Sequence, residues 1–176
     1  PLYRSLGDSE STVATIPVNA TIGDGSVAAT RAAALDAVAD GFDVLKVKVG
    51  ARSVEADAER LQAVREAVGR DVDLRADANG AWSLAEARRA IDGFPELEYL
   101  EQPLEPGDLA GHAALRDFAT IALDESRKAH STGEILDRGA ADVLVLKPMS
   151  VGGLDRAYQA GLSAQKAGGD PVVSTT

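Results

Sequence analysis

The chain has 176 residues, of which 45% are hydrophobic and 26% charged, which is enough for one globular domain with a hydrophobic core. Its formal net charge of −10 argues against nucleic acid or an anionic membrane as a partner, because both attract basic surfaces. The sequence has no cysteine, which excludes disulfides and thiolate zinc sites and fits a cytoplasmic protein, and no apolar run approaches the ~20 residues of a transmembrane helix.

Apolar segments typical of β-strands alternate along the sequence with segments rich in Ala, Arg and Glu that are typical of helices. We expect strands at 15–22, 44–50, 73–79, 98–104, 120–125, 142–148 and 171–176. The expected helices lie between them, at 27–40, 54–68, 84–93, 109–118, 131–138 and 154–167. Several of these helices follow a Ser or Asp that can cap a helix N-terminus.

This regular alternation predicts a parallel sheet covered by helices, either an open doubly wound sheet or a closed (β/α)₈ barrel. A closed barrel needs eight strands and usually about 250 residues, whereas the sequence supplies seven expected strands. We therefore expect residues 1–176 to form one incomplete domain of the TIM-barrel type, without the eighth strand. The first residue is Pro1 and not Met, so we also expect a piece of a longer protein.

Charged residues lie near the carboxyl ends of five consecutive expected strands: Lys48, Asp77, Glu101, Asp124 and Lys147. They are 29, 24, 23 and 23 residues apart, and each separation matches one strand–helix unit. In a barrel the carboxyl ends of the strands converge on one mouth, where barrel enzymes keep their active sites. An open sheet would spread these residues along an edge, so the pattern favours the barrel.

Two lysines, Lys46 and Lys48, lie two positions apart in one apolar strand, so their side chains are expected to share a face. The chain has only five lysines against thirteen arginines, and Lys147 also lies in an apolar segment. Lysine can act as a proton carrier, whereas arginine practically cannot. We expect Lys46 to push Lys48 towards its neutral form by like-charge repulsion. Snorkelling or ion-paired lysines are the alternative interpretation.

Asp77, Glu101 and Asp124 come from adjacent expected strands, so their negative charges would crowd together. A divalent cation would resolve this conflict, and an all-oxygen ligand set favours Mg²⁺, with Mn²⁺ as the second choice. The alternative is that the carboxylates form salt bridges with the lysines across the barrel. Asn79 and Glu125 lie close enough in sequence to support the ligands or a lysine, although Glu125 also suits the start of a helix.

Five motifs follow one another over nearly the whole chain: "KVK", "RADANGAW", "LEQPL", "ALDES" and "LKP". In this order the sequence resembles the enolase superfamily, in particular its muconate-cycloisomerase subgroup. The resemblance implies that Asp77, Glu101 and Asp124 bind Mg²⁺ and that Lys48 and Lys147 are the acid/base pair. It also implies an N-terminal capping domain, which we expect to be absent here together with the eighth strand. The end segments "PVNATI" and "PVVSTT" look most like the o-succinylbenzoate synthases.

The resemblance implies a Mg²⁺-dependent carbon–oxygen lyase of menaquinone biosynthesis that dehydrates a small carboxylate substrate through an enediolate. Lys48 would remove the proton beside the carboxylate, and Lys147 would stabilise the resulting charge. N-acylamino acid racemase, dipeptide epimerase and muconate cycloisomerase would use the same site and stay open as alternatives. A further alternative is an inactive barrel fragment that serves as a folding or association unit.

Ser174 and Thr176, in the last expected strand, are candidates for contacts with a distal carboxylate of the substrate. His112 and His130 fall in helix-like or loop segments, and we expect both at the surface. A seven-stranded piece of a barrel would leave the edges of its first and last strands open. We therefore expect the isolated chain to associate with itself.

Overall fold

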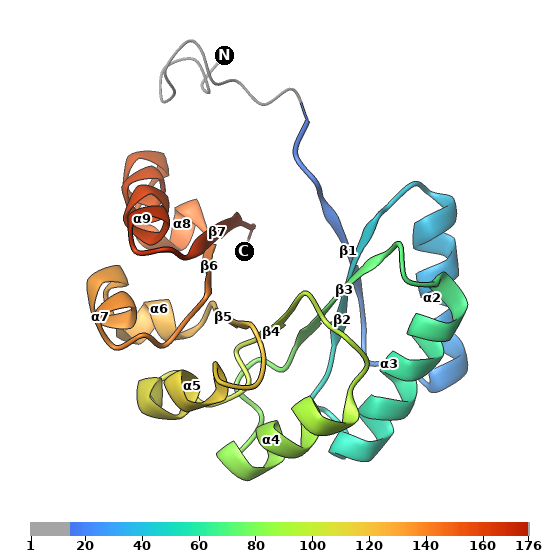
Figure 1. The fold of residues 1–176 in the computed structure, drawn as a ribbon. Coiled ribbons are helices and arrows are strands. Elements are labelled where there is room, and N and C mark those ends of the chain that lie inside the picture. Colours follow the sequence, from blue (N-terminus) through green and yellow to red (C-terminus); the bar gives the residue numbers. More distant parts are fainter. Residues whose placement is uncertain (1–14, 176) are drawn as a thin grey trace.

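The computed structural model describes residues 15–175 and shows a single parallel sheet with helices around it (Figure 1). The strands are hydrogen-bonded in the order in which they occur in the sequence, from β1 to β7. Their bounds are β1 Asn19–Ile22, β2 Val44–Lys48, β3 Asp73–Asp77, β4 Tyr99–Glu101, β5 Ile121–Leu123, β6 Val143–Leu146 and β7 Asp170–Val173. All six neighbouring pairs are parallel. The predicted α/β fold is confirmed.

The helices lie in the connections between the strands, and all but two short ones, Ser126–Ala129 and Pro148–Val151, were predicted from the sequence. Their bounds are α2 Val27–Ala39, α3 Val54–Val68, α4 Leu84–Gly93, α5 Leu109–Leu115, α6 Ser126–Ala129, α7 Thr132–Asp137, α8 Pro148–Val151 and α9 Leu154–Lys166. Serine hydroxyls accept hydrogen bonds from the first turns of four of them, α2, α3, α4 and α7, and so fix where these helices begin. None of the helices between residues 15 and 175 combines the length and apolarity that a bilayer crossing requires.

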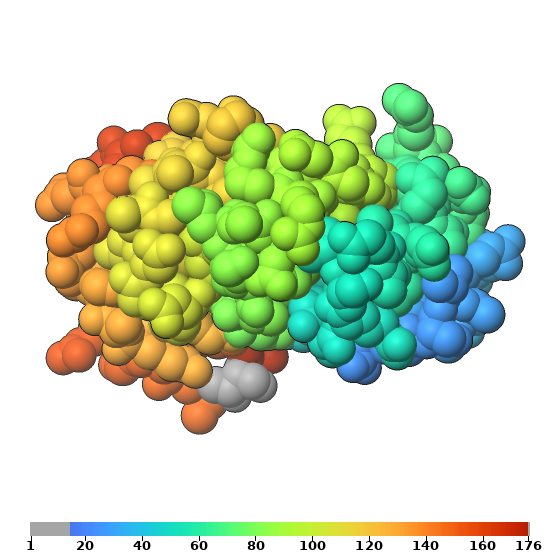
Figure 2. Space-filling view, turned by 90° about the horizontal axis from the view of Figure 1, so that it is seen from below, coloured from blue at the N-terminus to red at the C-terminus, as the bar shows by residue number. Residues whose placement is uncertain are grey.

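The sheet curls into a half-barrel with the helices on its convex side (Figure 1). Seen from below, the segments follow one another across the molecule from the blue N-terminal part to the orange C-terminal part (Figure 2). Within residues 15–175, β1 pairs only with β2 and β7 only with β6, so the sheet does not close on itself. This arrangement confirms the prediction of an incomplete barrel with seven strands.

Side chains along each strand alternate between the two faces of the curled sheet. The convex face packs against the helices through fully buried residues such as Leu45, Leu74 and Leu100. The concave face carries a smaller apolar cluster of Tyr99, Ala122, Val143 and Val145, packed against Val172. Glu101 lies two residues after Tyr99 in β4, and Asp77 of β3 lies opposite Glu101, so both carboxylates also face the concave side.

The strands end earlier than the sequence predicted, because the backbone leaves the sheet soon after the charged residues. Asn79 and Gln102 have positive φ angles of 47° and 41°, which turn the chain away from β3 and β4. Asp124 and Lys147 lie one residue beyond β5 and β6, and not within the strands as predicted. All the same, these side chains sit at the carboxyl ends of their strands, where a barrel places its functional groups.

Candidate active site on the concave face

The register of the parallel strands brings the first three candidate residues level with one another. Lys48 of β2 lies opposite Asp77 of β3, and Asp77 lies opposite Glu101 of β4. Neighbouring strands are about 4.8 Å apart, so these side chains leave the sheet side by side. The level ends of β2, β3 and β4 therefore form one continuous charged row on the concave face.

Lysine ammonium groups pair with all three candidate ligand carboxylates. Lys46 Nζ lies 2.9 Å from Glu101 Oε2 and 3.4 Å from Asp77 Oδ2. Lys48 Nζ lies 2.6 Å from the same Asp77 oxygen. At the next pair of strand ends, Lys147 Nζ donates to Asp124 Oδ2. Lys46 and Lys48 both contact Asp77 Oδ2, so their side chains lie on the same face of β2, as predicted.

Asn79 links Lys48 to Glu125. Lys48 Nζ donates to Asn79 Oδ1 at 2.8 Å, and Asn79 Nδ2 donates to Glu125 Oε1 at 2.8 Å. The Asn79 backbone N–H donates to Asp77 Oδ1 at 3.1 Å, which ties this side chain to the charged row. Asn79 and Glu125 were both predicted to support the site. Asn79 contacts Lys48 directly, and Glu125 is connected to Lys48 through the Asn79 side-chain amide.

Glu101 is a buried carboxylate of which only one oxygen is hydrogen-bonded. Its side chain is 1% exposed, and its Oε1 is buried without a hydrogen-bond partner. Burial, followed by the negative charge of Asp77, raises the pKa of Glu101 to about 7. A buried carboxylate oxygen without a donor is destabilising, since nothing replaces the water that it has lost.

The residues fit a hard divalent cation, although they do not already form a ligand cluster. In the described part of the chain no three acidic or histidine side chains stand close enough together to hold a metal. The lysine pairs seen here correspond to the salt-bridge alternative. However, the unpartnered Glu101 Oε1 and an all-carboxylate donor set suit Mg²⁺. A bound cation would neutralise the carboxylate charges that the lysine ammonium groups neutralise in this structure.

Lys46 stays charged next to Lys48. Burial disfavours the Lys46 ammonium, but the carboxylates of Glu101 and Asp77 outweigh burial and raise its pKa. Its side chain is 13% exposed, compared with 36% for Lys48. The deeper lysine is therefore a fixed positive charge, and the shallower one is open to a substrate.

Gln102 is a buried residue that the sequence did not single out. Its Oε1 accepts hydrogen bonds from the backbone N–H groups of Asp124 and Ser126, at 3.2 and 3.0 Å. Its Nε2 donates to Ser126 Oγ at 2.8 Å and to the Leu104 carbonyl at 3.0 Å. One amide thus fixes the backbone that carries Asp124. The only signal in the sequence was its place beside Glu101 in "LEQPL".

The prediction that His112 lies at the surface is wrong. His112 is fully buried on the inner side of α5, and its Nδ1 lies 2.7 Å from the Asp108 carbonyl. The Leu104 backbone N–H donates to Nε2 at 3.3 Å, which requires a neutral ring. Burial lowers the pKa of His112, in agreement with that state. His130, the other histidine, is partly exposed.

The predicted substrate contacts at the end of the chain remain predictions. Ser174 is half-buried just beyond β7, and its backbone N–H donates to the Leu146 carbonyl at 2.9 Å. Its hydroxyl lies 3.4 Å from the Thr175 carbonyl. Thr176 lies outside the described residues.

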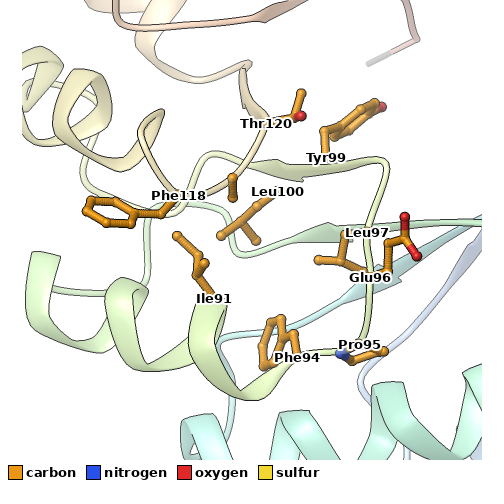
Figure 3. Close-up of a pocket in the computed structure, with 10 residues that line it drawn as sticks. Ile91, Phe94, Pro95, Glu96, Leu97, Tyr99, Leu100, Phe118 and Thr120 are labelled. Carbon is orange, nitrogen blue, oxygen red and sulfur yellow. The ribbon is translucent and has the colours of Figure 1, made fainter.

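An open pocket of about 310 Å³ lies at the opposite ends of the strands (Figure 3). It is bounded by the end of α4 and by the residues that lead into β4 and β5. Its lining is mostly apolar and includes Ile91, Phe94, Leu97 and Leu100. Glu96 is its one acidic residue, so this pocket does not bring together the groups found on the concave face.

Comparisons with known proteins find relatives that include epimerases and o-succinylbenzoate synthases. A hydrophobic dipeptide epimerase from Enterococcus faecalis is 38% identical over 173 residues, which are 96% of this chain and 48% of that protein. An o-succinylbenzoate synthase from Thermobifida fusca is 41% identical over 167 residues, which are 92% of this chain and 50% of that protein. The chain therefore spans about half the length of these relatives.

A solved structure agrees with this relationship. The dipeptide epimerase from Enterococcus faecalis, complexed with Mg and the dipeptide L-Leu-L-Tyr, superposes with a TM-score of 0.91 and 35% identity. The match covers 100% of this chain and 50% of that one. The family model described as Enolase C-terminal domain-like matches residues 29–173. The chain thus belongs to the Enolase C-terminal domain-like family, within the enolase superfamily.

Proposed function

We propose that this chain carries the acid/base site of a Mg²⁺-dependent enzyme that removes the proton beside a carboxylate of a small substrate. The observation that carries this proposal is the placement of Lys48 and Lys147. They lie at the ends of β2 and β6, on either side of the strands that bear the three carboxylates, and each contacts one of those carboxylates. Two proton carriers thus flank one anionic centre.

Asp77, Glu101 and Asp124 would hold the Mg²⁺ ion. The unpartnered Oε1 of Glu101 and the raised pKa of that group support this assignment. When bound, a divalent cation stabilises the negative charge that develops on a substrate carboxylate as the neighbouring proton leaves. A related structure, the epimerase from Enterococcus faecalis, was solved with Mg.

The protein's own groups move the proton. Lys48 would accept it at Nζ, and Lys46 lies beside it as a fixed positive charge. Asn79 Oδ1 contacts Lys48 Nζ and so holds the amine on the concave face. Lys147, from the other side, either steadies negative charge on the substrate or exchanges a proton of its own.

The first candidate reaction is the dehydration that forms o-succinylbenzoate, in the menaquinone pathway predicted from the sequence. Lys48 would take the proton from carbon and return it to the departing hydroxide, so that water leaves. This candidate is supported by the relative from Thermobifida fusca and by the similarity of the two end segments.

The second candidate is epimerisation of a dipeptide, in which one lysine removes the proton and the other returns a proton to the opposite face. It is supported by the relative from Enterococcus faecalis and by the similar carboxylate pairing of both lysines.

A product assay separates these candidates. The 176-residue chain, and the longer product where its reading frame continues, are incubated with Mg²⁺ in D₂O with a hydrophobic L,L-dipeptide or with the hydrated precursor of o-succinylbenzoate. Deuterium uptake with inversion at carbon identifies an epimerase, and release of o-succinylbenzoate identifies the lyase. If neither substrate changes and neither takes up deuterium, the proposal is contradicted for these substrates and the inactive fragment is favoured.

A further inference from the structure

Helix α3 carries an ion pair that is completely shielded from solvent. Arg60 Nη1 lies 2.6 Å from Asp57 Oδ1, and the two side chains are 1% and 0% exposed. A buried ion pair rarely adds net stability, because removing both charges from water offsets their attraction. The contacts that this pair makes with its surroundings are therefore the better guide to its role.

Arg60 connects the carboxyl ends of the first two strands. Its Nη1 donates to the carbonyl of Lys48, the last residue of β2, at 3.0 Å. Its Nη2 donates to the carbonyl of Gly23, which directly follows β1, at 2.7 Å. Its Nε donates to Thr30 Oγ1 in α2 at 3.1 Å. One rigid guanidinium thus joins two strand ends and two helices.

Asp57 holds the other side of the same turn. Its Oδ2 accepts a hydrogen bond from the Gly50 backbone N–H at 2.7 Å, while its Oδ1 is engaged by Arg60. Between these two anchors the Val49 N–H donates to the Asp77 carbonyl at 2.9 Å. Three backbone groups between the Lys48 and Gly50 Cα atoms are therefore fixed, two of them by the ion pair.

We propose that Arg60 and Asp57 are positioning residues that aim the Lys48 side chain at the substrate. The direction of a side chain follows from the orientation of its own backbone, and the Lys48 carbonyl is held by Arg60. The inference rests on the proposed function for the part that Lys48 plays in proton transfer. The contacts of the pair themselves do not depend on which substrate is used.

Arg65 offers a matched control on the same helix. Like Arg60, it donates to backbone carbonyls, at 2.6 Å to Gly69, 2.7 Å to Val72 and 3.1 Å to Glu96. Val72 and Glu96 precede β3 and β4, so these bonds lie at the ends of the strands that face away from the lysines. The two arginines therefore share residue type, helix and carbonyl partners, but they fix opposite ends of the sheet, and Arg65 is only partly buried.

The first test compares Arg60→Lys with Arg65→Lys in the complete reading frame, with the substrate that the wild-type protein turns over. A displaced base slows the chemical step, so Arg60→Lys is expected to lower kcat by about tenfold or more with little change in KM. Arg65→Lys is expected to keep both constants close to those of the wild-type protein. Equal effects of the two variants, or an effect of Arg60→Lys on KM alone, would overturn the inference.

The second test does not depend on activity. The chain has five lysines, so ¹⁵N-labelled lysine gives few side-chain signals to assign by NMR. In Arg60→Lys, or in the milder Thr30→Val if the former does not fold, the Lys48 Nζ signal should shift while those of Lys128 and Lys166 stay in place. Arg65→Lys should leave Lys48 unshifted. An unchanged Lys48 signal in a folded Arg60→Lys or Thr30→Val protein contradicts the positioning role even if no substrate is found.

Discussion

Lys46 and Lys48 are neighbours on one face of β2, yet their surroundings give them different properties. Lys46 is the deeper of the two and lies between the carboxylates of Glu101 and Asp77, which keep it charged. Lys48 is less buried and also contacts the amide of Asn79. Lys46 is thus a fixed charge close to the sheet, whereas the Lys48 amine is accessible, as a group that exchanges a proton with a substrate must be.

His112 gives a pH dependence that does not involve the candidate site residues. Burial lowers its pKa below the unfolded value of 6.5, so the unfolded chain takes up the proton first as the pH falls. Glu101, whose pKa is raised to about 7, makes the free energy of unfolding rise as the pH falls through the same range. His112 opposes this with a slope of at most about 1.4 kcal/mol per pH unit, which lowers the free energy of unfolding below pH 6.5. Urea titrations at pH 7.5, 6.5 and 5.5, as chosen conditions, measure it. His112→Gln should remove this slope and His130→Gln should keep it, and the reverse result would refute the assignment to His112.

Helix α3 and the turn that precedes it connect the convex packing layer to the concave face. The helix buries Leu61 and Val64 against the sheet, and it also presents Arg60 and Asp57 to the end of β2. Gly50, in the turn, has a φ of +90°, and a Cβ there would lie 2.7 Å from Ala81 Cβ and 3.1 Å from the Ala78 carbonyl. The turn after β2 thus packs directly on the turn after β3.

Gly50→Ala should destabilise the protein more than Gly69→Ala does. Both glycines have positive φ, which costs an L-residue about 1–2 kcal/mol. A Cβ at Gly69 would meet nothing within 4 Å, whereas a Cβ at Gly50 would collide and add about 1–3 kcal/mol of overpacking. Urea denaturation of both variants measures the difference in the free energy of unfolding. Equal losses would show that the turn after β2 moves aside without strain.

For the molecule as a whole, the features that repeat along the sequence were predictable and the single tertiary contacts were not. The spacing of Lys48, Asp77 and Asp124 by one strand–helix unit was enough to predict that they gather at one end of the sheet. The hydrogen bonds of Gln102 and the burial of His112 depend on how α5 and the β5–α6 turn pack, and no periodic pattern encodes that packing. The short helices α6 and α8 were missed for the same reason, since four residues show no helical period.

The open edges of the half-barrel lead to a prediction about association. Within residues 15–175, β1 and β7 each pair on one side only. Val18, just before β1, is 66% exposed, and Val173, the last residue of β7, is 72% exposed. Unpaired edges next to apolar side chains recruit other strands. Light scattering of the 176-residue chain should therefore show an apparent mass that rises with concentration. Val173→Lys should reduce the rise, since edge lysines oppose pairing, and a monomer at all concentrations would contradict this prediction.

Deuterium exchange beside the substrate carboxylate is the most direct measurement of the proposed acid/base chemistry. It detects proton removal by NMR whether the reaction ends in epimerisation or in loss of water. In the complete reading frame with Mg²⁺, Lys48→Ala should reduce the exchange rate by about 10²-fold or more. Lys166→Ala, which alters an exposed lysine of α9, should leave the rate unchanged. Exchange that continues undiminished in a folded Lys48→Ala protein would show that Lys48 is not the base.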